Sequence, residues 1–412
     1  MRSSISLGTL LSALLMASLA LGQTPPSTGS AFPKGAATSS EECGVCHQAI
    51  YREFQFGIGA DLHYSGMVLK SATEQKLNLP AGTSGGATAH AISGIDPFPI
   101  HARDAEEKGR SCDVCHYPQS FKIPSMDAPE SVKPIARSKE QEAQGLTCAS
   151  CHLTPEGSIR APHQVNAPHP TVVEPEIQSA AMCAYCHSMG KRVIGKQTQT
   201  FLEWREDFNK PGLGRQQCQD CHMPRTVRKT AEGFDVPLRP VARHLWTGGH
   251  SLQRLGSALS LTLVQPQQNT NALEIHIVNI GAGHSVPTGS NRRGLFLRTE
   301  VLDERGKIIT KNEWMFAPSF GNRPDDRRFL EEDKKREDAI AASQADAQGP
   351  HESSIRAGEE RIIAWAPELK RGTYKVRAVL IYDLNRYNDP GFADDQTTLT
   401  RAALDMVVDL QR

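Results

Sequence analysis

The pattern of apolar and polar positions changes after residue 250. In the last part of the chain, apolar residues recur at every second position, as at Leu259, Leu261 and Leu263. Successive side chains of a strand point to opposite faces, so this alternation predicts half-buried strands. The predicted strands span 259–264, 273–277, 295–302, 362–365, 374–382 and 403–408. Turn residues separate them, and we therefore expect a β-sandwich of about six or seven short strands over residues 251–412.

Residues 41–250 lack this alternation and show helical spacing only locally, as at Phe201, Trp204 and Phe208 in the sequence FLEWREDF. The chain holds 33 Gly and 26 Pro and is only 38% hydrophobic, which predicts irregular backbone and few core side chains. The expected fold class is α+β, with a mostly irregular and helical domain at 41–250 followed by the β-sandwich domain. Something other than side chains is expected to fill part of the first domain.

The first 40 residues have the composition of a targeting segment. Arg2 is followed by an apolar stretch, and Ala20-Leu21-Gly22 has the small residues of a cleavage site. We expect a signal peptide over 1–22, a disordered lead-in over 23–40, and export to the periplasm or the cell exterior. An uncleaved membrane anchor is the alternative, although the apolar stretch is marginal for a spanning helix.

Charge is balanced along the whole chain, with 46 basic and 46 acidic residues. This balance excludes a general basic surface, and no nucleic-acid partner is expected. Within the predicted sandwich, residues 325–350 are dense in charge and Ala. We interpret them as a surface helix or a mobile insertion.

All ten cysteines fall in five CxxC pairs, and His follows each pair at once. The five motifs are Cys43, Cys46 and His47; Cys112, Cys115 and His116; Cys148, Cys151 and His152; Cys183, Cys186 and His187; and Cys218, Cys221 and His222. CxxCH is the attachment signature of c-type haem. Two thiols on one turn reach the two vinyl groups of the porphyrin, and the next residue binds the iron through its imidazole.

Other uses of CxxC fit less well. A zinc ribbon takes two CxxC units per metal, and disulfides do not require His after every pair. We therefore predict five covalently bound c-type haems, each with a proximal His from its own motif, and no structural disulfide. Haem attachment machinery is accordingly an expected partner during maturation.

The ligand on the opposite side of each haem decides between electron transfer and catalysis, because an iron with two His ligands has no open position. The candidate distal ligands are His63, His101, His163, His244, His250 and His284. Met67, Met189 or Met223 are alternatives that would raise a haem's potential.

Local sequence supports each distal candidate differently. His63 follows the first motif, and His163 follows the third and is preferred to its neighbour His169. His101 is preferred to His90 in a Gly/Pro-rich loop before the second motif.

The remaining two candidate regions lie at and beyond the domain junction. His244 and His250 flank Leu-Trp-Thr-Gly-Gly at the junction, and at least one is expected to reach a haem. His284 lies in the glycine-rich loop GAGHSVPTG, where glycine permits close approach of the backbone to a haem. A plain turn with an exposed His is the alternative for that loop.

The segments CQDCHMP (218–224) and GHSVPTG (283–289) carry a resemblance, with weaker matches over 41–67, 145–165, 201–217, 244–259 and the rest of 278–307. The chain resembles the multihaem cytochromes c of the cytochrome c-554 and c-552 class, in the form with a C-terminal β-domain. The resemblance implies close, stacked haem pairs. It also implies that His63 and His163 serve haems other than those of their nearest motifs. The chain departs from the four-haem cytochrome c-554 in having five motifs and a long gap before Cys112.

Two functions remain open from the sequence. The first is an electron carrier that relays electrons between redox partner proteins, a quinol-side donor and a periplasmic or extracellular acceptor. The second is an oxidoreductase with one five-coordinate haem that acts on a small nitrogen or sulfur species. The absence of CxxCK counts against the pentahaem nitrite reductases. A variant of the electron-carrier function is self-assembly into a filament, in which a neighbouring chain supplies one distal His.

Overall fold

The computed structural model describes residues 39–56, 121–128, 146–188, 200–249, 251–289, 293–318, 352–384 and 396–408. The predicted signal peptide, the charged insertion 325–350 and the whole second motif (Cys112, Cys115 and His116) lie outside these residues. The same holds for His63, His101 and His250.

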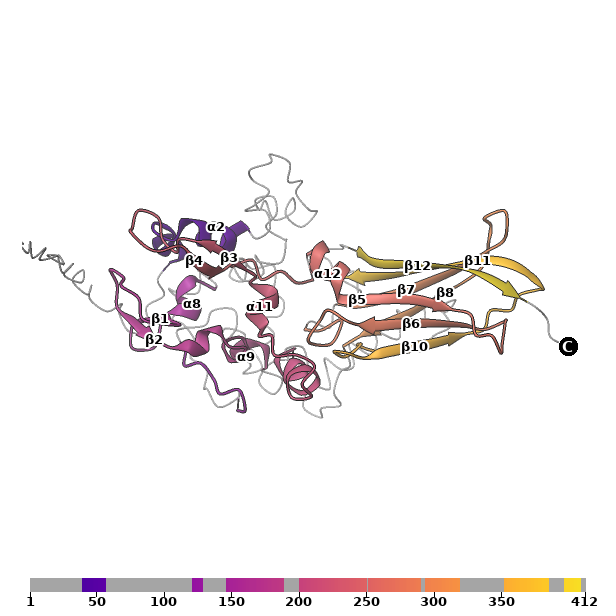
Figure 1. The fold of residues 1–412 in the computed structure, drawn as a ribbon, viewed down its shortest axis with the longest axis horizontal. Coiled ribbons are helices and arrows are strands. Elements are labelled where there is room, and N and C mark those ends of the chain that lie inside the picture. The colour runs from indigo at the N-terminus through magenta and orange to yellow at the C-terminus, as the bar shows by residue number, and fades with distance from the viewer. Residues whose placement is uncertain are drawn as a thin grey trace, which may run out of the picture.

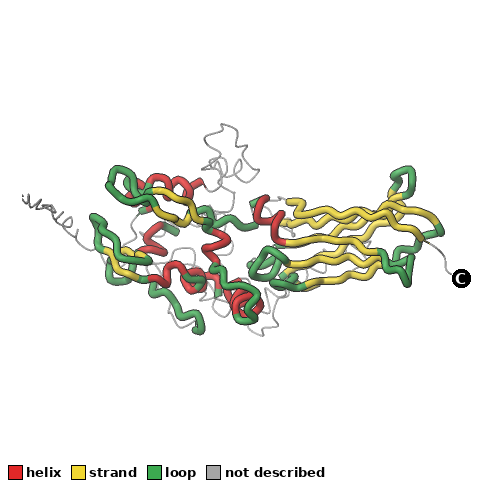
Figure 2. Tube along the Cα trace, viewed as in Figure 1, coloured by secondary structure: helices red, strands yellow, loops and turns green. Residues whose placement is uncertain are grey.

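Helices and strands are distributed unevenly along the chain (Figure 2). The helical elements are α1 (Ser40–Gly44), α2 (Gln48–Phe56), α8 (Cys148–His152), the 3₁₀ helix η3 (Pro175–Gln178), α9 (Ala181–His187), α10 (Thr200–Glu203), the π-helix η4 (Trp204–Asn209), α11 (Cys218–His222) and α12 (Leu252–Ala258). The strands are β1 (Ile159–Ala161), β2 (Thr171–Val173), β3 (Arg225–Arg228), β4 (Arg239–Ala242), β5 (Leu259–Val264), β6 (Leu273–Asn279), β7 (Gly294–Leu302), β8 (Ile308–Ala317), β9 (Glu352–Ser353), β10 (Glu360–Trp365), β11 (Gly372–Asp383) and β12 (Gln396–Val408).

Short helices and two small two-stranded sheets, β1–β2 and β3–β4, make up the described residues 39–249, here called the N-terminal region. Strands β5–β12 make up the sheet region, residues 259–408, and α12 lies between the two (Figure 1). The mixed α+β class expected from the sequence is confirmed. None of the helices in the described part has the length and apolarity needed to cross a membrane.

The sheet region contains two sheets, with strand orders β10-β6-β5 and β12-β11-β7-β8-β9. Neighbouring strands are antiparallel, except for the short β8–β9 pair. In β6, Leu273, Ile275 and Ile277 are fully buried and alternate with partly exposed residues. This is the register that the period-two pattern predicted.

All six strands predicted from alternation are present, but two were missed. Strand β8 was missed because its first six residues, which include Lys311 and Glu313, are exposed or half-buried and only its last four residues are buried. Strand β9 is two residues long and follows the charged insertion. The predicted helix at FLEWREDF is confirmed as helical, although it begins as α10 and continues as the π-helix η4.

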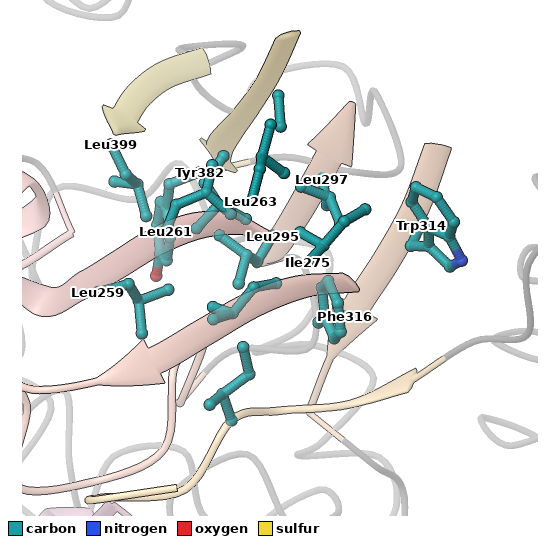
Figure 3. Packing of buried hydrophobic residues seen from close by; sticks show 14 of the residues in the cluster. Leu259, Leu261, Leu263, Ile275, Leu295, Leu297, Trp314, Phe316, Tyr382 and Leu399 are labelled. Atoms are coloured by element: carbon teal, nitrogen blue, oxygen red, sulfur yellow. The ribbon is translucent and has the colours of Figure 1, made fainter. Parts of the chain in front are cut away.

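The two sheets share one apolar core, to which β5, β6, β7 and β8 all contribute. Figure 3 shows Leu261, Ile275 and Leu295 pointing into the same space. In the described part of the N-terminal region, by contrast, the clusters of buried apolar side chains are two small groups. These groups are Phe121, Met182 and Tyr185, and Ala180, Ala184, Phe201 and Trp204. Side chains alone therefore supply far more core to the sheet region.

The shared core makes Ile275 a sensitive position. Ile275→Ala removes fully buried methyl groups and is expected to lower the free energy of unfolding by about 3 kcal/mol, from lost burial and the cavity left behind. Ile362→Ala on the neighbouring strand β10 is the matched control, because Ile362 is 51% exposed. Its effect should stay within about 0.5 kcal/mol. Chemical unfolding followed by circular dichroism compares the two, and equal losses would contradict the shared core.

Candidate haem sites

Each described CxxCH motif forms a helical turn. In α8 and α11 the helix is the motif itself, and α9 ends with it. Residues i, i+3 and i+4 lie on the same face of a helix. The two thiols and the imidazole of a motif are therefore presented together, which explains why this spacing suits attachment of one flat group. In the first motif the helix α1 carries Cys43, and Cys46 and His47 follow in the next turn.

The cysteines of the four described motifs are all partly buried, and none is joined to another by a disulfide. They are Cys43, Cys46, Cys148, Cys151, Cys183, Cys186, Cys218 and Cys221. Cys186, the second thiol of the fourth motif, packs against the apolar group of Phe121, Met182 and Tyr185, as does Cys151 of the third. Their thioether bonds to haem stay a prediction.

The motifs lie against one another in two pairs. Cys43 of the first motif hydrogen-bonds with Cys148 of the third, which raises the pKa of Cys43 and lowers that of Cys148 to about 7. Cys183 of the fourth motif hydrogen-bonds with Cys218 of the fifth in the same way. Motifs one and three are therefore direct neighbours, and so are motifs four and five.

The third motif faces a histidine from much later in the chain. The ring centroids of His152 and His244 are 6.1 Å apart and their planes differ by 30°. Burial lowers the pKa of His152 to about 4 and, together with the nearby His152, lowers that of His244 to about 3. Both imidazoles are therefore neutral at pH 7, the form that binds a metal.

The fifth motif has the same arrangement. The ring centroids of His222 and His284 are 6.1 Å apart and their planes differ by 13°. Burial and the proximity of His284 lower the pKa of His222 to about 4. His222 belongs to α11 in the N-terminal region, whereas His284 lies in the loop between β6 and β7. This pair therefore spans the two regions.

These separations fit an iron between the rings. A metal–imidazole bond of about 2.0 Å and a ring radius of about 1.1 Å on each side place two centroids about 6.2 Å apart. Both observed pairs match this value.

The hydrogen bonds of the rings also suit metal binding. Nδ1 of His222 donates to the carbonyl of Thr247 at 2.5 Å, and Nδ1 of His47 donates to that of Thr230 at 2.6 Å. Nδ1 of His244 donates to a carbonyl at 3.1 Å, and Nδ1 of His284 donates to one at 2.9 Å. A carbonyl only accepts, so Nδ1 carries the proton and Nε2 keeps the lone pair that a haem iron needs.

Two arginines bind backbone carbonyls at the C-terminal ends of the motif helices α8 and α11. Arg160 is buried and donates to the carbonyls of Cys151 at 2.9 Å and Leu153 at 2.8 Å. Arg254 donates to the carbonyl of Cys221 and to the hydroxyl of Thr247 at 3.2 Å. The last carbonyls of a helix have no partner within it, so these guanidinium groups satisfy and fix the ends of α8 and α11.

Glu53, 3% exposed, organises the segment that carries His244. Its carboxylate accepts hydrogen bonds from Arg228 at 2.7 and 2.8 Å, from Arg243 at 2.7 Å and from the backbone N–H of His244 at 3.0 Å. Burial by itself would raise the pKa of Glu53, but the bonds from Arg228 and Arg243 prevail and lower it. Glu53 is therefore an ionised group that anchors the backbone of His244.

The glycines around His284 permit close backbone contacts. A side chain at Gly281 would place its Cβ 1.9 Å from the carbonyl oxygen of Ser257, and one at Gly283 would lie 3.2 Å from the rings of Trp204 and Phe208. The loop could not pack against α12 and η4 in this way with larger residues.

The preference for His163 over His169 is not supported by their surroundings. His163 is exposed, and its Nε2 accepts a hydrogen bond from Arg239 at 2.5 Å, because a guanidinium can only donate. That bond occupies the nitrogen that would bind iron. His169 is half-buried, and burial together with the nearby His47 lowers its pKa. Desolvation and the proximity of His284 lower the pKa of His187 of the fourth motif.

The sequence patterns did not indicate that Glu53, Arg160 and Arg254 support the motif helices and the segment of His244. Glu53 is one acidic residue in an aromatic helix, and its partner Arg243 is 190 positions away. The structure pairs His276 with Glu360 at 2.8 Å on the outer face of β6.

No model of a protein family matches this chain, and no curated protein matches it. The solved structure of a penta-haem cytochrome c552 from Thermochromatium tepidum matches it with a TM-score of 0.51 and 16% identity. The match covers 90% of this chain and 99% of that one. The chain has the fold of a pentahaem cytochrome c. The resemblance inferred from the sequence is thus confirmed for the fold. A β-glucuronidase of glycoside hydrolase family 2 also matches over 36% of this chain, with a TM-score of only 0.13 and 8% identity, which carries no argument.

Loss of the Glu53 carboxylate should be costly. Glu53→Ala leaves Arg228 and Arg243 without their shared anion, and we expect the free energy of unfolding to fall by about 3 kcal/mol. Glu156→Ala, at an exposed carboxylate, is the control and should change it by less than about 0.5 kcal/mol. Denaturant unfolding measures both. If Glu53→Ala proved as mild as the control, the anchoring role of Glu53 would be wrong.

Proposed function

We propose that this chain is an exported electron-transfer protein that carries five covalent c-type haems and relays electrons between redox partner proteins. The spacing of the two histidine pairs, 6.1 Å in each, is the observation that carries the proposal. Similarity in fold to a penta-haem cytochrome supports it. When bound, haem supplies a one-electron iron couple whose potential depends on its axial ligands and surroundings.

Two axial ligand sets follow from the pairs. His152 and His244 would hold the iron of the third haem, and His222 and His284 that of the fifth. Carbonyl acceptors on Nδ1 fix the rings of His222, His244 and His284, and burial lowers the pKa values of His152, His222 and His244 so that these imidazoles are neutral at pH 7. An iron with two such ligands offers no position for a substrate, which favours electron transfer over catalysis at these two sites.

Contacts between motifs support an order for the relay. Haems attached at motifs one and three would be neighbours, as would those at motifs four and five, because their first cysteines touch. The short segment Arg243–Thr247 links the two pairs. It carries His244 for the third haem, and its Thr247 carbonyl holds His222 for the fifth. The proposed order is one, three, five, four, with the second motif outside the described residues.

The sheet region acquires a specific part in this proposal. It would supply His284 as an axial ligand to a haem of the N-terminal region. The physiological partners proposed are a quinol-side donor and a periplasmic or extracellular acceptor.

Low-temperature EPR of the purified ferric protein, with haem content quantified, tests the proposal. We expect five haems per chain and low-spin signals only. A high-spin component of about one fifth of the iron, altered by nitrite or cyanide, would instead indicate an open haem and the oxidoreductase function.

Replacing a distal ligand should open one haem. His244→Ala and His284→Ala are each expected to convert about one fifth of the iron from low spin to high spin. His276→Ala is the matched control, because its ring lies on the outer face of β6 and should leave the spectrum unchanged. Unchanged low-spin spectra in either distal variant would refute that ligand pair.

The distal ligand of the first haem is chosen between two neighbouring histidines, His163 and His169. Because Arg239 occupies Nε2 of His163 whereas His169 lies near His47, we expect His169→Ala to produce a high-spin haem and His163→Ala to leave the EPR spectrum intact. The reverse result would restore the choice made from the sequence.

A further inference from the structure

Glu203 lies at the contact between the N-terminal region and the sheet region. It is the last residue of α10 in the N-terminal region, directly before η4. Its carboxylate faces the loop of the sheet region that carries His284, as the contacts below show. None of the roles described so far uses this residue.

The carboxylate holds that loop at two points. Oε2 of Glu203 accepts a hydrogen bond from the backbone N–H of Ser285 at 3.2 Å and from the hydroxyl of Thr288 at 2.6 Å. The Thr200 and Thr288 hydroxyls also hydrogen-bond to each other at 2.9 Å. One contact is to the residue next to His284, so the position of the imidazole depends on the carboxylate.

The loop is also fixed from within the sheet region. Asn279 at the end of β6 is buried; its Nδ2 donates to the carbonyl of His284 at 2.9 Å and its Oδ1 accepts from the N–H of Ala282 at 3.1 Å. Asn279 therefore shapes the loop, but it belongs to the same region as His284. It cannot by itself orient the loop toward α11.

The link to the opposite ligand runs through η4. Trp204, the residue after Glu203, donates from Nε1 to the carbonyl of Gln216 at 3.0 Å, two positions before the fifth motif. The rings of Trp204 and Phe208 also pack against Gly283. One helical segment thus contacts both the loop of His284 and the chain that leads to His222.

We propose that Glu203 is a positioning residue that fastens the loop 281–289 to η4 and holds His284 opposite His222. The proposal rests on the ligand pair proposed above. It adds that ligation of the fifth haem requires docking of the sheet region through this carboxylate, so that the spin state of that haem reports on the docking.

Variants of Glu203 in the full haem-loaded protein test this. Glu203→Ala removes both acceptor contacts and is expected to convert about one fifth of the iron to high spin in EPR. Glu203→Gln keeps an oxygen acceptor for Ser285 and Thr288 and should retain the low-spin spectrum. Glu206→Ala, three residues later at an exposed carboxylate, is the matched control and should also leave the spectrum unchanged.

A second site on the loop keeps the test decisive if Glu203→Ala does not fold. Thr288→Val removes the hydroxyl that bonds Glu203, whereas Thr288→Ser keeps it. We expect a high-spin fraction in the first variant only. Hydrogen exchange of the Ser285 amide should accelerate by about tenfold or more in Glu203→Ala and Thr288→Val.

Failure of this inference is distinguishable from failure of the ligand pair. If His284→Ala opens a haem but Glu203→Ala and Thr288→Val keep low-spin spectra and slow exchange, Glu203 has no positioning role and the pair stands. If His284→Ala itself leaves every haem low-spin, the pair falls and the inference with it.

Discussion

The proposed haem ligation requires two imidazoles to face each other at a fixed separation, and this requirement is the strictest constraint on the chain. The rings of His152 and His244, and those of His222 and His284, come from segments far apart in sequence and lie 6.1 Å apart. Under the proposed ligation, each separation has to accommodate two metal–imidazole bonds of about 2.0 Å. Much of the surrounding polar structure is consistent with holding these four rings in place.

The supports follow one physical rule, that buried polar groups need partners. Arg160 and Arg254 satisfy the free carbonyls at the ends of the two motif helices, and Glu53 satisfies two arginines and the N–H of His244. Each bond removes a cost of burial and also fixes a ligand-bearing segment. Stability and ligand geometry are thus achieved by the same contacts.

The two regions differ in how their interiors are filled. The sheet region has alternating Leu and Ile side chains that fill the space between two sheets (Figure 3). The described N-terminal region has small apolar groups around its motifs, in keeping with an interior shared with flat cofactors. The glycines of the loop 281–289 let the two regions approach closely enough for His284 to face α11.

Local patterns by themselves determined much of this protein. Period-two alternation located six strands, because one face of each is buried, and the CxxCH spacing located the helical turns, because it places three side chains on one face. The partners of those turns were decided only by tertiary structure. Nothing near His169, Glu53 or Glu203 in sequence indicates its contacts, because each partner lies in a distant segment. The meeting of His284 with His222 likewise depends on how two separately patterned regions dock, and periodicity within either region carries no information about that.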